Sequence, residues 1–262
     1  MRVRGFTLIE MVASIVLLGV VGLFLGEVIR QSLVLFSDTS SREALVQQGR
    51  FVTERLRREL REAVPNSVVV NGDGSCIEFV PIVNSGLYQQ LPVVGSSDTL
   101  RVLPITKQIT ANDRLTIYPT SNSELRATPT GSGQVTVIEN DVTFTTPVPP
   151  ATWSMVDIDL TPPTVFTNGS PANRFYIYNQ LVAFCKFGST LNRYSGYPLG
   201  RLDLDPVYLG APTKMVENLS GANFVVEQPQ LQRNGLIKME LIFEAKGEQV
   251  RFDHDALIYN TP

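Results

Sequence analysis

The fold of this chain is decided by the stretch G-F-T-L-I-E at positions 5–10 and by the apolar run that follows it at 11–26. Arg2 and Arg4 precede the stretch, so a positively charged head stands before an apolar core. This order is typical of a segment that enters a membrane while its arginines stay on the cytoplasmic side. Glu10 is the anomaly, because it places a carboxylate inside the entry segment.

The apolar segment is expected to remain in the mature protein. A secretory signal has small residues after its apolar core, where it is cleaved, whereas here the small residue Gly5 stands before the core. At about 1.5 Å per residue, residues 6–26 reach across the roughly 30 Å of a bilayer interior. We therefore predict a transmembrane segment over 6–26.

Glu10 needs either an interfacial position or a partner charge. An ionised carboxylate at bilayer depth costs at least about 2.5 kcal/mol. Cleavage between Gly5 and Phe6 would supply a partner, because it creates a new amino terminus close to Glu10 along the helix. A plain signal anchor with a chance glutamate is the alternative interpretation.

The stretch at 5–10 resembles the processing site of type IV pilins and of type II secretion pseudopilins. The resemblance implies that residues 1–5 are a leader peptide, which prepilin peptidase removes by cutting between Gly5 and Phe6. It also implies N-methylation of Phe6 and contact between Glu10 and the amino terminus of a neighbouring subunit during assembly. The first half of the helix would anchor the protein in the inner membrane before assembly.

Composition bounds the class of protein. The chain has 262 residues, of which 18% are charged, and its formal net charge is -3. This mildly acidic balance gives no electrostatic reason to expect a nucleic acid partner. Residues 64–262 are enough to bury a core, so we predict one β-rich globular head after the helix.

A single long helix is predicted over 6–63, because apolar residues keep recurring at spacings of three and four until Val64-Pro65 ends the pattern. The glycines within 19–26 each lower helix propensity by about 1 kcal/mol relative to alanine, which favours either bending during assembly or close helix packing. S-S-R-E at 40–43 reads as a capping box and predicts a possible break with a fresh helix start.

The last turns of this helix carry five arginines and three glutamates over residues 50–62. Several of them stand four residues apart with opposite charge, as Arg55 and Glu59 do, which supports the helix. The pattern indicates a solvated face above an apolar stripe that packs on a sheet; a subunit contact surface is the alternative.

The sequence after residue 66 changes to short β-branched and aromatic runs separated by Gly, Pro, Asn and Ser. A helix followed by strands, without alternation, predicts an α+β fold of the type IV pilin kind, with the long helix packed on a large antiparallel β head. Pro-rich stretches at 147–150 and 161–171 predict surface loops. Strands are predicted at 67–71, 76–83, 100–104, 114–118, 135–138, 142–146, 155–160, 174–178, 182–187, 190–194, 223–227, 236–243, 249–252 and 256–259.

Two cysteines, Cys76 and Cys185, both lie in predicted strands. An exported head would stand in an oxidising compartment, where the two could form a disulfide that closes a long loop. Buried free cysteines are common small apolar residues, so that interpretation stays open.

Segments along the whole chain resemble minor pilins of mannose-sensitive haemagglutinin (MSHA) pili. The resemblance implies a cell-adhesion pilus, a head in the periplasm before assembly, and partners that are the major pilin, other minor pilins and prepilin peptidase. It also implies a role in priming assembly at or near the extracellular pilus tip. A J-like type II secretion pseudopilin, a glycan-binding tip adhesin and a membrane-tethered enzyme are the alternatives. The resemblance is carried by residues 54–61, 64–67, 76–82, 233–235 and 259–262.

Catalytic and cofactor sites are not indicated. The single histidine, His254, lies between two aspartates, but no G-x-S-x-G elbow accompanies it, and an exposed histidine near the C-terminus is the simpler interpretation. Zinc-type spacing of Cys and His is absent. Carboxylate pairs at Asp157/Asp159 and Asp203/Asp205 could hold calcium, but such pairs more often mark the solvent-exposed face of a strand. We therefore expect no enzyme activity, no cofactor and no metal.

Aromatic residues concentrate in two stretches of the head. Exposed aromatic faces stack on the apolar surfaces of sugars, so these residues could form a sugar-binding platform. Aromatic residues that alternate along strands are normally core residues or cross-strand pairs, and we expect that here. The residues concerned are Phe175, Tyr176, Tyr178, Tyr194, Tyr197 and Tyr208.

Overall fold

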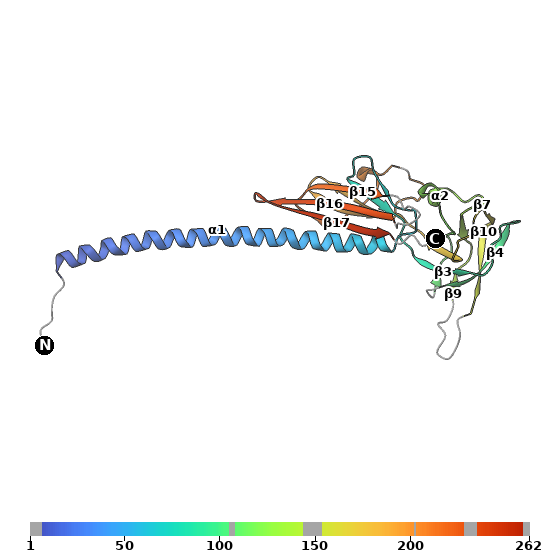
Figure 1. The fold of residues 1–262 in the computed structure, drawn as a ribbon, viewed down its shortest axis with the longest axis horizontal. Helices are drawn as coiled ribbons and strands as arrows, with labels where there is room; N and C mark the ends of the chain where they lie inside the picture. Colours follow the sequence, from blue (N-terminus) through green and yellow to red (C-terminus); the bar gives the residue numbers. More distant parts are fainter. Residues whose placement is uncertain (1–6, 105–107, 144–153, 202, 228–234, 259–262) are drawn as a thin grey trace.

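One long helix leads into a β-rich head, as Figure 1 shows. The arrangement is an α+β fold, in which the helix packs on a mainly antiparallel head, consistent with the type IV pilin fold predicted from the sequence. The computed structural model describes residues 7–104, 108–143, 154–201, 203–227 and 235–258.

Helix α1 (Leu8–Arg61) has 54 residues and ends within two residues of the predicted boundary. Its length is about 80 Å at the usual rise per residue. The break predicted near 40–43 is wrong, because α1 is continuous there. Ser40, the cap of the predicted box, lies inside this helix, and the Ser41 hydroxyl beside it donates to the Ser37 carbonyl one turn earlier, at 2.8 Å, as serines inside helices do.

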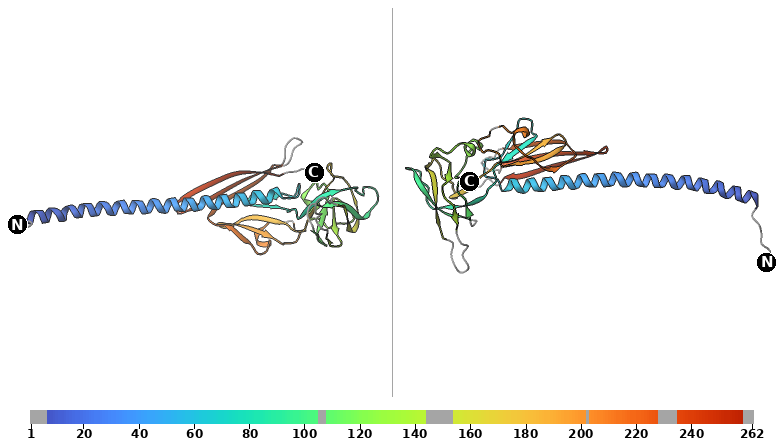
Figure 2. Two further views of the ribbon diagram at one scale, coloured as in Figure 1. Left: turned by 90° about the horizontal axis from the view of Figure 1, so that it is seen from below. Right: turned by 180° about the vertical axis from the view of Figure 1, so that it is seen from behind.

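The second half of α1 packs against two sheets, one on each side of it (Figure 2). The first is a five-stranded antiparallel sheet with the order β1-β2-β12-β13-β14. Its strands are β1 (Val69–Val70), β2 (Cys76–Phe79), β12 (Val182–Phe187), β13 (Thr190–Ser195) and β14 (Thr213–Val216).

The second is a three-stranded antiparallel sheet that ends the described chain. Strict alternation puts Leu241 and Phe252, which are register partners, on the face toward the helix. Two predicted strands, 249–252 and 256–259, are one continuous strand here as far as residue 258, because the alternation is not interrupted between them. The strands are β15 (Leu219–Glu227), β16 (Gly235–Ala245) and β17 (Glu248–Ile258).

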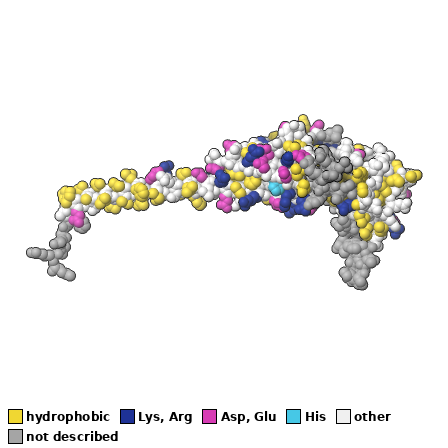
Figure 3. All heavy atoms as spheres, viewed as in Figure 1, with side chains coloured by type: hydrophobic (Ala, Val, Ile, Leu, Met, Phe, Trp, Pro, Cys, Tyr) yellow, Lys and Arg dark blue, Asp and Glu magenta, His cyan; other side chains and the backbone are white. Residues whose placement is uncertain are grey.

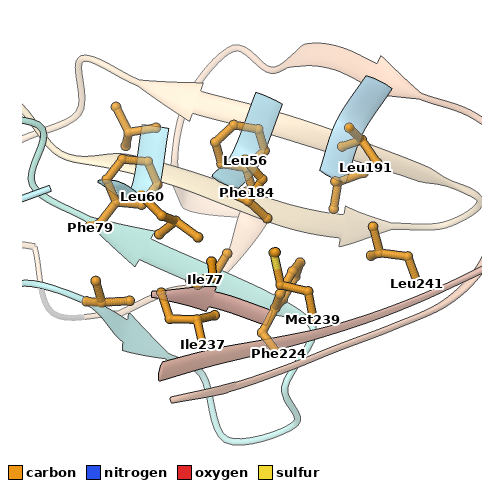
Figure 4. Close-up of a cluster of buried hydrophobic side chains, with 14 of the residues drawn as sticks. Leu56, Leu60, Ile77, Phe79, Phe184, Leu191, Phe224, Ile237, Met239 and Leu241 are labelled. Carbon is orange, nitrogen blue, oxygen red and sulfur yellow. The ribbon is translucent and has the colours of Figure 1, made fainter. Parts of the chain in front are cut away.

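A core cluster fills the space between α1 and these two sheets, as the close-up in Figure 4 shows. Leu56 and Leu60 come from the helix, Phe79 and Phe184 from the five-stranded sheet, and Met239 from the three-stranded sheet. Together these elements form what we call the helix body.

The rest of the head is a closed barrel beyond the C-terminal end of α1 (Figures 1 and 2). Six strands follow the order β4-β3-β11-β6-β8-β10, and β10 pairs back onto β4 to close the ring. A second core cluster that includes Leu115, Phe166 and Phe175 fills the interior. The strands are β3 (Asn84–Tyr88), β4 (Ser97–Pro104), β6 (Arg114–Thr116), β8 (Val135–Ile138), β10 (Val156–Phe166) and β11 (Arg174–Tyr178).

Smaller elements complete the barrel region. A short strand extends the barrel sheet in parallel to β10, and a two-stranded ribbon lies beside it. These elements are β5 (Gln108–Ile109), β7 (Ser132–Gly133), β9 (Val142–Thr143) and the helix α2 (Asn122–Arg126); a 3-10 turn, η1 (Pro206–Tyr208), follows β13.

The helix body and the barrel meet at a third core cluster. Period-two alternation sends Phe184 of β12 into the helix body and its neighbour Ala183 to the opposite face. In the same way Ile177 of β11 faces the barrel interior while Tyr178 faces the helix body. We call this shared layer the junction.

The loop predicted over 161–171 is wrong in its first part, because β10 continues to Phe166. Pro162 and Pro163 fall where the β10–β4 register shifts, between Asp159 and Thr164, so the missing amide donors cost no ladder bond to β4. The other predicted loop, 147–150, lies outside the described residues. The predicted strands 135–138, 174–178 and 182–187 are confirmed with the same bounds as β8, β11 and β12.

Candidate assembly site and head junction

The first half of α1 is a bare apolar rod. Every residue from 7 to 36 is exposed, and hydrophobic side chains make up much of the rod on the face that Figure 3 shows. Leu23 and Phe24 are 80% and 69% exposed. By length and composition α1 can cross a membrane, and its apolar window is buried nowhere in the monomer. An apolar surface of this extent marks a contact with lipid or with other proteins.

Glu10 stands in the first turn of this rod and is exposed. A carboxylate at this end is favoured by the helix dipole. Thr7 precedes the helix with an extended backbone, but its side chain makes no cap hydrogen bond. Within the part of the chain that the structure describes, no hydrogen bond or ion pair engages the Glu10 carboxylate. The predicted processing residues, Gly5 and Phe6, lie outside the described residues.

The three glycines of the rod leave open space around the backbone. A Cβ added at Gly19, Gly22 or Gly26 would meet no atom within 4 Å among those described. The backbone of another helix can approach closely at such positions, as small residues allow in membrane helix pairs. The helix shows no break there, so bending at this point stays a prediction about assembly.

The Cys76–Cys185 disulfide lies at the centre of the junction. The two cysteines are direct register partners on β2 and β12, and both are fully buried. The bond closes a loop of 109 residues that contains the whole barrel, and in the chain-entropy model a loop of this length is worth about 4 to 5 kcal/mol.

A buried ion pair crosses the junction beside the disulfide. The Arg126 guanidinium of α2 binds the Glu78 carboxylate of β2, and the Tyr197 hydroxyl donates to the same carboxylate at 2.6 Å. Arg126 also donates to Asn122 Oδ1 and to the Arg201 carbonyl. Burial lowers the pKa of Arg126 and raises the pKa of Tyr197 from their ordinary values. This cluster therefore fixes the barrel to the helix body.

This cluster is not apparent from the sequence alone. Glu78 occupies a strand position between Ile77 and Phe79, and all three are buried. A charged residue inside an otherwise apolar strand is the signal that a buried partner exists, but the partner came from a five-residue helix that no pattern indicated.

The candidate aromatic platform separates into two groups. Five of the six residues are buried, in the junction or in the barrel core, as expected for strand aromatics. Tyr208 differs, because it is 58% exposed in η1 and carries the Arg201 guanidinium 5.3 Å from its ring centroid. The buried residues are Phe175, Tyr176, Tyr178, Tyr194 and Tyr197.

His254 is not the exposed residue that was expected. It lies on β17 opposite Met239, on the face toward α1, and its ring is half-buried. Its Nε2 atom is buried and has no hydrogen-bond partner among the described residues. Strand alternation explains the difference, because the flanking Asp253 and Asp255 take the outward positions.

One aspartate of each candidate calcium pair accepts a hydrogen bond from a neighbouring part of the head. Asp159 accepts a hydrogen bond from Asn140 at 3.0 Å, and Asp205 accepts one from the Val207 amide at 3.0 Å, which caps η1. Among the described residues, no group of three or more His, Cys, Asp or Glu side chains could hold a metal ion.

Comparison with known proteins identifies the amino-terminal segment. Residues 1–26 match the family described as the prokaryotic N-terminal methylation motif. No curated protein and no solved structure matches the chain. The motif indicates a type IV pilin-like or pseudopilin-like protein, a structural class that is not typically enzymatic. Together with the apolar helix it indicates membrane anchoring before assembly, processing by prepilin peptidase and assembly with pilus components.

Proposed function

We propose that this protein is a minor pilin of an MSHA-type type IV pilus, of the MshO kind, and that it primes pilus assembly at or near the tip. Prepilin peptidase would cut between Gly5 and Phe6 and methylate Phe6. The inner membrane would hold residues 6–26 until the subunit enters the fibre, with the head in the periplasm. The observation that carries the proposal is the exposed apolar rod at 7–36, whose first twenty residues belong to the methylation motif at 1–26.

Burial supplies the physical reason. Burying one large apolar side chain stabilises a protein by about 1.5–3 kcal/mol. A rod with apolar residues on every side is therefore unfavourable in water and needs a cover. Lipid covers it before assembly, and the corresponding rods of neighbouring subunits can cover it in the fibre. The second half of α1 needs no such cover, because the head already buries its stripe.

The Glu10 carboxylate supports a position for this protein directly below another subunit in the pilus. Its carboxylate is exposed in the monomer and would have to be neutralised in an apolar bundle. The amino terminus of a subunit already in place is the natural partner. Crosslinking that found no subunit distal to this one would remove this part of the proposal.

The barrel supports a place near the tip. It extends beyond the C-terminal end of α1, where a stacked subunit would have to fit (Figure 1). Each subunit distal to this one must avoid the barrel, so a position with few distal neighbours is sterically the simplest.

The test combines mass analysis with pilus counts. Purified protein from assembled fibres should begin with N-methylated Phe6, and deletion of the gene should reduce the number of surface pili strongly. Glu10→Ala should fail to restore pili, whereas Asp38→Ala should restore them, because Asp38 is an equally exposed carboxylate farther along the same helix. Fibres that contain protein beginning at Met1, or full piliation with Glu10→Ala, would contradict the proposal.

A J-like type II secretion pseudopilin is the second candidate, because the methylation motif is shared between pilins and pseudopilins. The two functions differ in location and phenotype. A pseudopilin would be absent from surface pili, and its deletion would block protein secretion while leaving the pilus number unchanged.

A further inference from the structure

A cavity of about 580 Å³ opens on the side of the head, between the helix body and the barrel. Three segments that are distant in sequence form it: β1 with the turn that follows it, the helix α2, and the segment 203–208 that includes η1. The segment 203–208 contributes the carboxylate pair Asp203/Asp205 and the exposed aromatic residue Tyr208 to the lining.

The groups that remain available in this cavity are acceptors and an aromatic ring. Asp203 is exposed, and its carboxylate makes no hydrogen bond or ion pair with any residue that the structure describes. Asp205 is also exposed and uses one oxygen, Oδ1, to cap Val207. Tyr208 is 58% exposed and presents an apolar surface.

The Arg126 and Asn71 side chains in the cavity wall already form hydrogen bonds within the head. The Arg126 guanidinium binds the Glu78 carboxylate and donates hydrogen bonds to Asn122 and to the Arg201 carbonyl. The Asn71 amide binds Ser75 Oγ and the Cys76 amide. Among the described lining residues, an anionic ligand would therefore meet two carboxylates and a single arginine, Arg126, whose charge is already paired with Glu78.

Cationic ligands fit little better. The Arg201 guanidinium already lies over the Tyr208 ring at 5.3 Å and would repel a second cation there. A calcium ion needs six to eight oxygen ligands. The wall offers the two carboxylates, while the side-chain oxygens of Asn71 and Asn122 already accept other hydrogen bonds.

We propose that this cavity binds a neutral saccharide. Hydroxyl groups of a sugar donate charge-assisted hydrogen bonds to carboxylates such as those of Asp203 and Asp205, and these bonds are stronger than bonds between neutral groups. The face of the Tyr208 ring opposite the Arg201 guanidinium can cover an apolar sugar face. The volume lies within the range of small-molecule sites and accommodates one or two sugar rings. Use of this site as an adhesive contact outside the cell rests on the proposed pilus function; the binding itself does not.

The experiment measures sugar binding to the full chain in a detergent that carries no sugar group. Saturation-transfer NMR would be run with glucose, galactose, mannose and N-acetylglucosamine as probes. At least one of them should give a signal, and Asp203→Asn and Tyr208→Ala should each weaken its binding by about tenfold or more. Asp205 is left unchanged, because its carboxylate also caps η1.

Two matched variants control for general effects. Asp98→Asn makes the same isosteric change at an exposed aspartate of β4, and Phe187→Ala removes an aromatic ring that is 58% exposed, as Tyr208 is. Both should bind the probe as the wild type does. Absence of signal with all four sugars, equal losses in the controls, or binding of calcium in place of sugar would overturn the inference.

The pilus count separates this inference from the proposed function. Asp203→Asn should leave the number of surface pili unchanged, because the cavity lies on the head and not on the rod. Loss of pili on Glu10→Ala with intact sugar binding would support both proposals. Normal pili in the deletion strain with intact sugar binding would contradict the pilus function alone.

Discussion

The two halves of α1 show how one helix serves two environments. From residue 7 to residue 36 every side chain is exposed and most are apolar. In the second half a single stripe is buried against two sheets, and the opposite side carries charged residues such as Arg50 and Arg58. The buried stripe consists of Leu45, Gly49, Val52, Thr53, Leu56 and Leu60.

The difference in burial between the two halves of α1 assigns them different roles, one in assembly and the other in the stability of the head. A helix with one apolar stripe needs cover on that side alone, whereas a helix that is apolar all round must be enclosed. Changes in the second half should therefore act on the folding of the head, and changes in the first half on membrane retention and fibre assembly.

The largest expected effect concerns leucine. Leu56 is fully buried in the core of the helix body, so Leu56→Ala should lower the free energy of unfolding by about 2–5 kcal/mol. Leu23 is 80% exposed, and Leu23→Ala should leave head unfolding unchanged. Chemical denaturation of the full chain in micelles measures both. Similar losses for the two variants would show that the halves are not independent.

Glycine substitutions should give a smaller and more informative difference. A Cβ at Gly49 would clash with the aromatic ring of Phe252 on β17. Gly49→Ala therefore forces this ring to move and should lower the free energy of unfolding by about 1–3 kcal/mol. At Gly22 an added Cβ meets no described atom within 4 Å, so Gly22→Ala should not destabilise the head.

Pilus counts on the Gly22→Ala variant decide between the two interpretations of the rod glycines. Alanine raises helix propensity by about 1 kcal/mol, so a requirement for local bending during assembly would reduce the pilus number. The variant Gly22→Leu adds bulk with similarly high helix propensity. A defect confined to Gly22→Leu would indicate close helix packing instead.

The elements with strong local patterns could be predicted from the sequence. Helix α1 follows from its long apolar periodicity, and β8, β11 and β12 from β-branched and aromatic runs. The disulfide was one of two open interpretations, because sequence places Cys76 and Cys185 in strands but does not say that the strands are neighbours.

The closed barrel could not be predicted, because its closure depends on pairing between strands that are distant in sequence. β10 pairs with β4 across more than fifty residues, and it runs through two prolines that locally predict a loop. Strand β3 contains Asn84, Ser85 and Gly86, which individually favour turns. The Glu78–Arg126 pair and the cavity beside it exist only after this closure brings α2 to β2.

The smallest expected effect concerns one glutamate in each half of α1. Glu59 forms an ion pair with a strand of the head, whereas Glu27 forms one with a residue three positions along the helix. Glu59 is 14% exposed in its side chain and accepts from Arg55 one turn earlier and from Arg193 of β13 at 3.1 Å. Glu59→Gln should lower the free energy of unfolding by about 1 kcal/mol, because a partly buried pair is worth somewhat more than a surface pair.

Glu27 is the matched position in the rod, since it pairs with Arg30 on the fully exposed side of the helix. Glu27→Gln should leave unfolding of the head unchanged within error. Adding Arg193→Ala to Glu59→Gln should cost less than the sum of the single changes, because both remove the same tertiary pair. If the two changes are instead additive, the pair contributes nothing, and the charged side of the second half acts only through solvation.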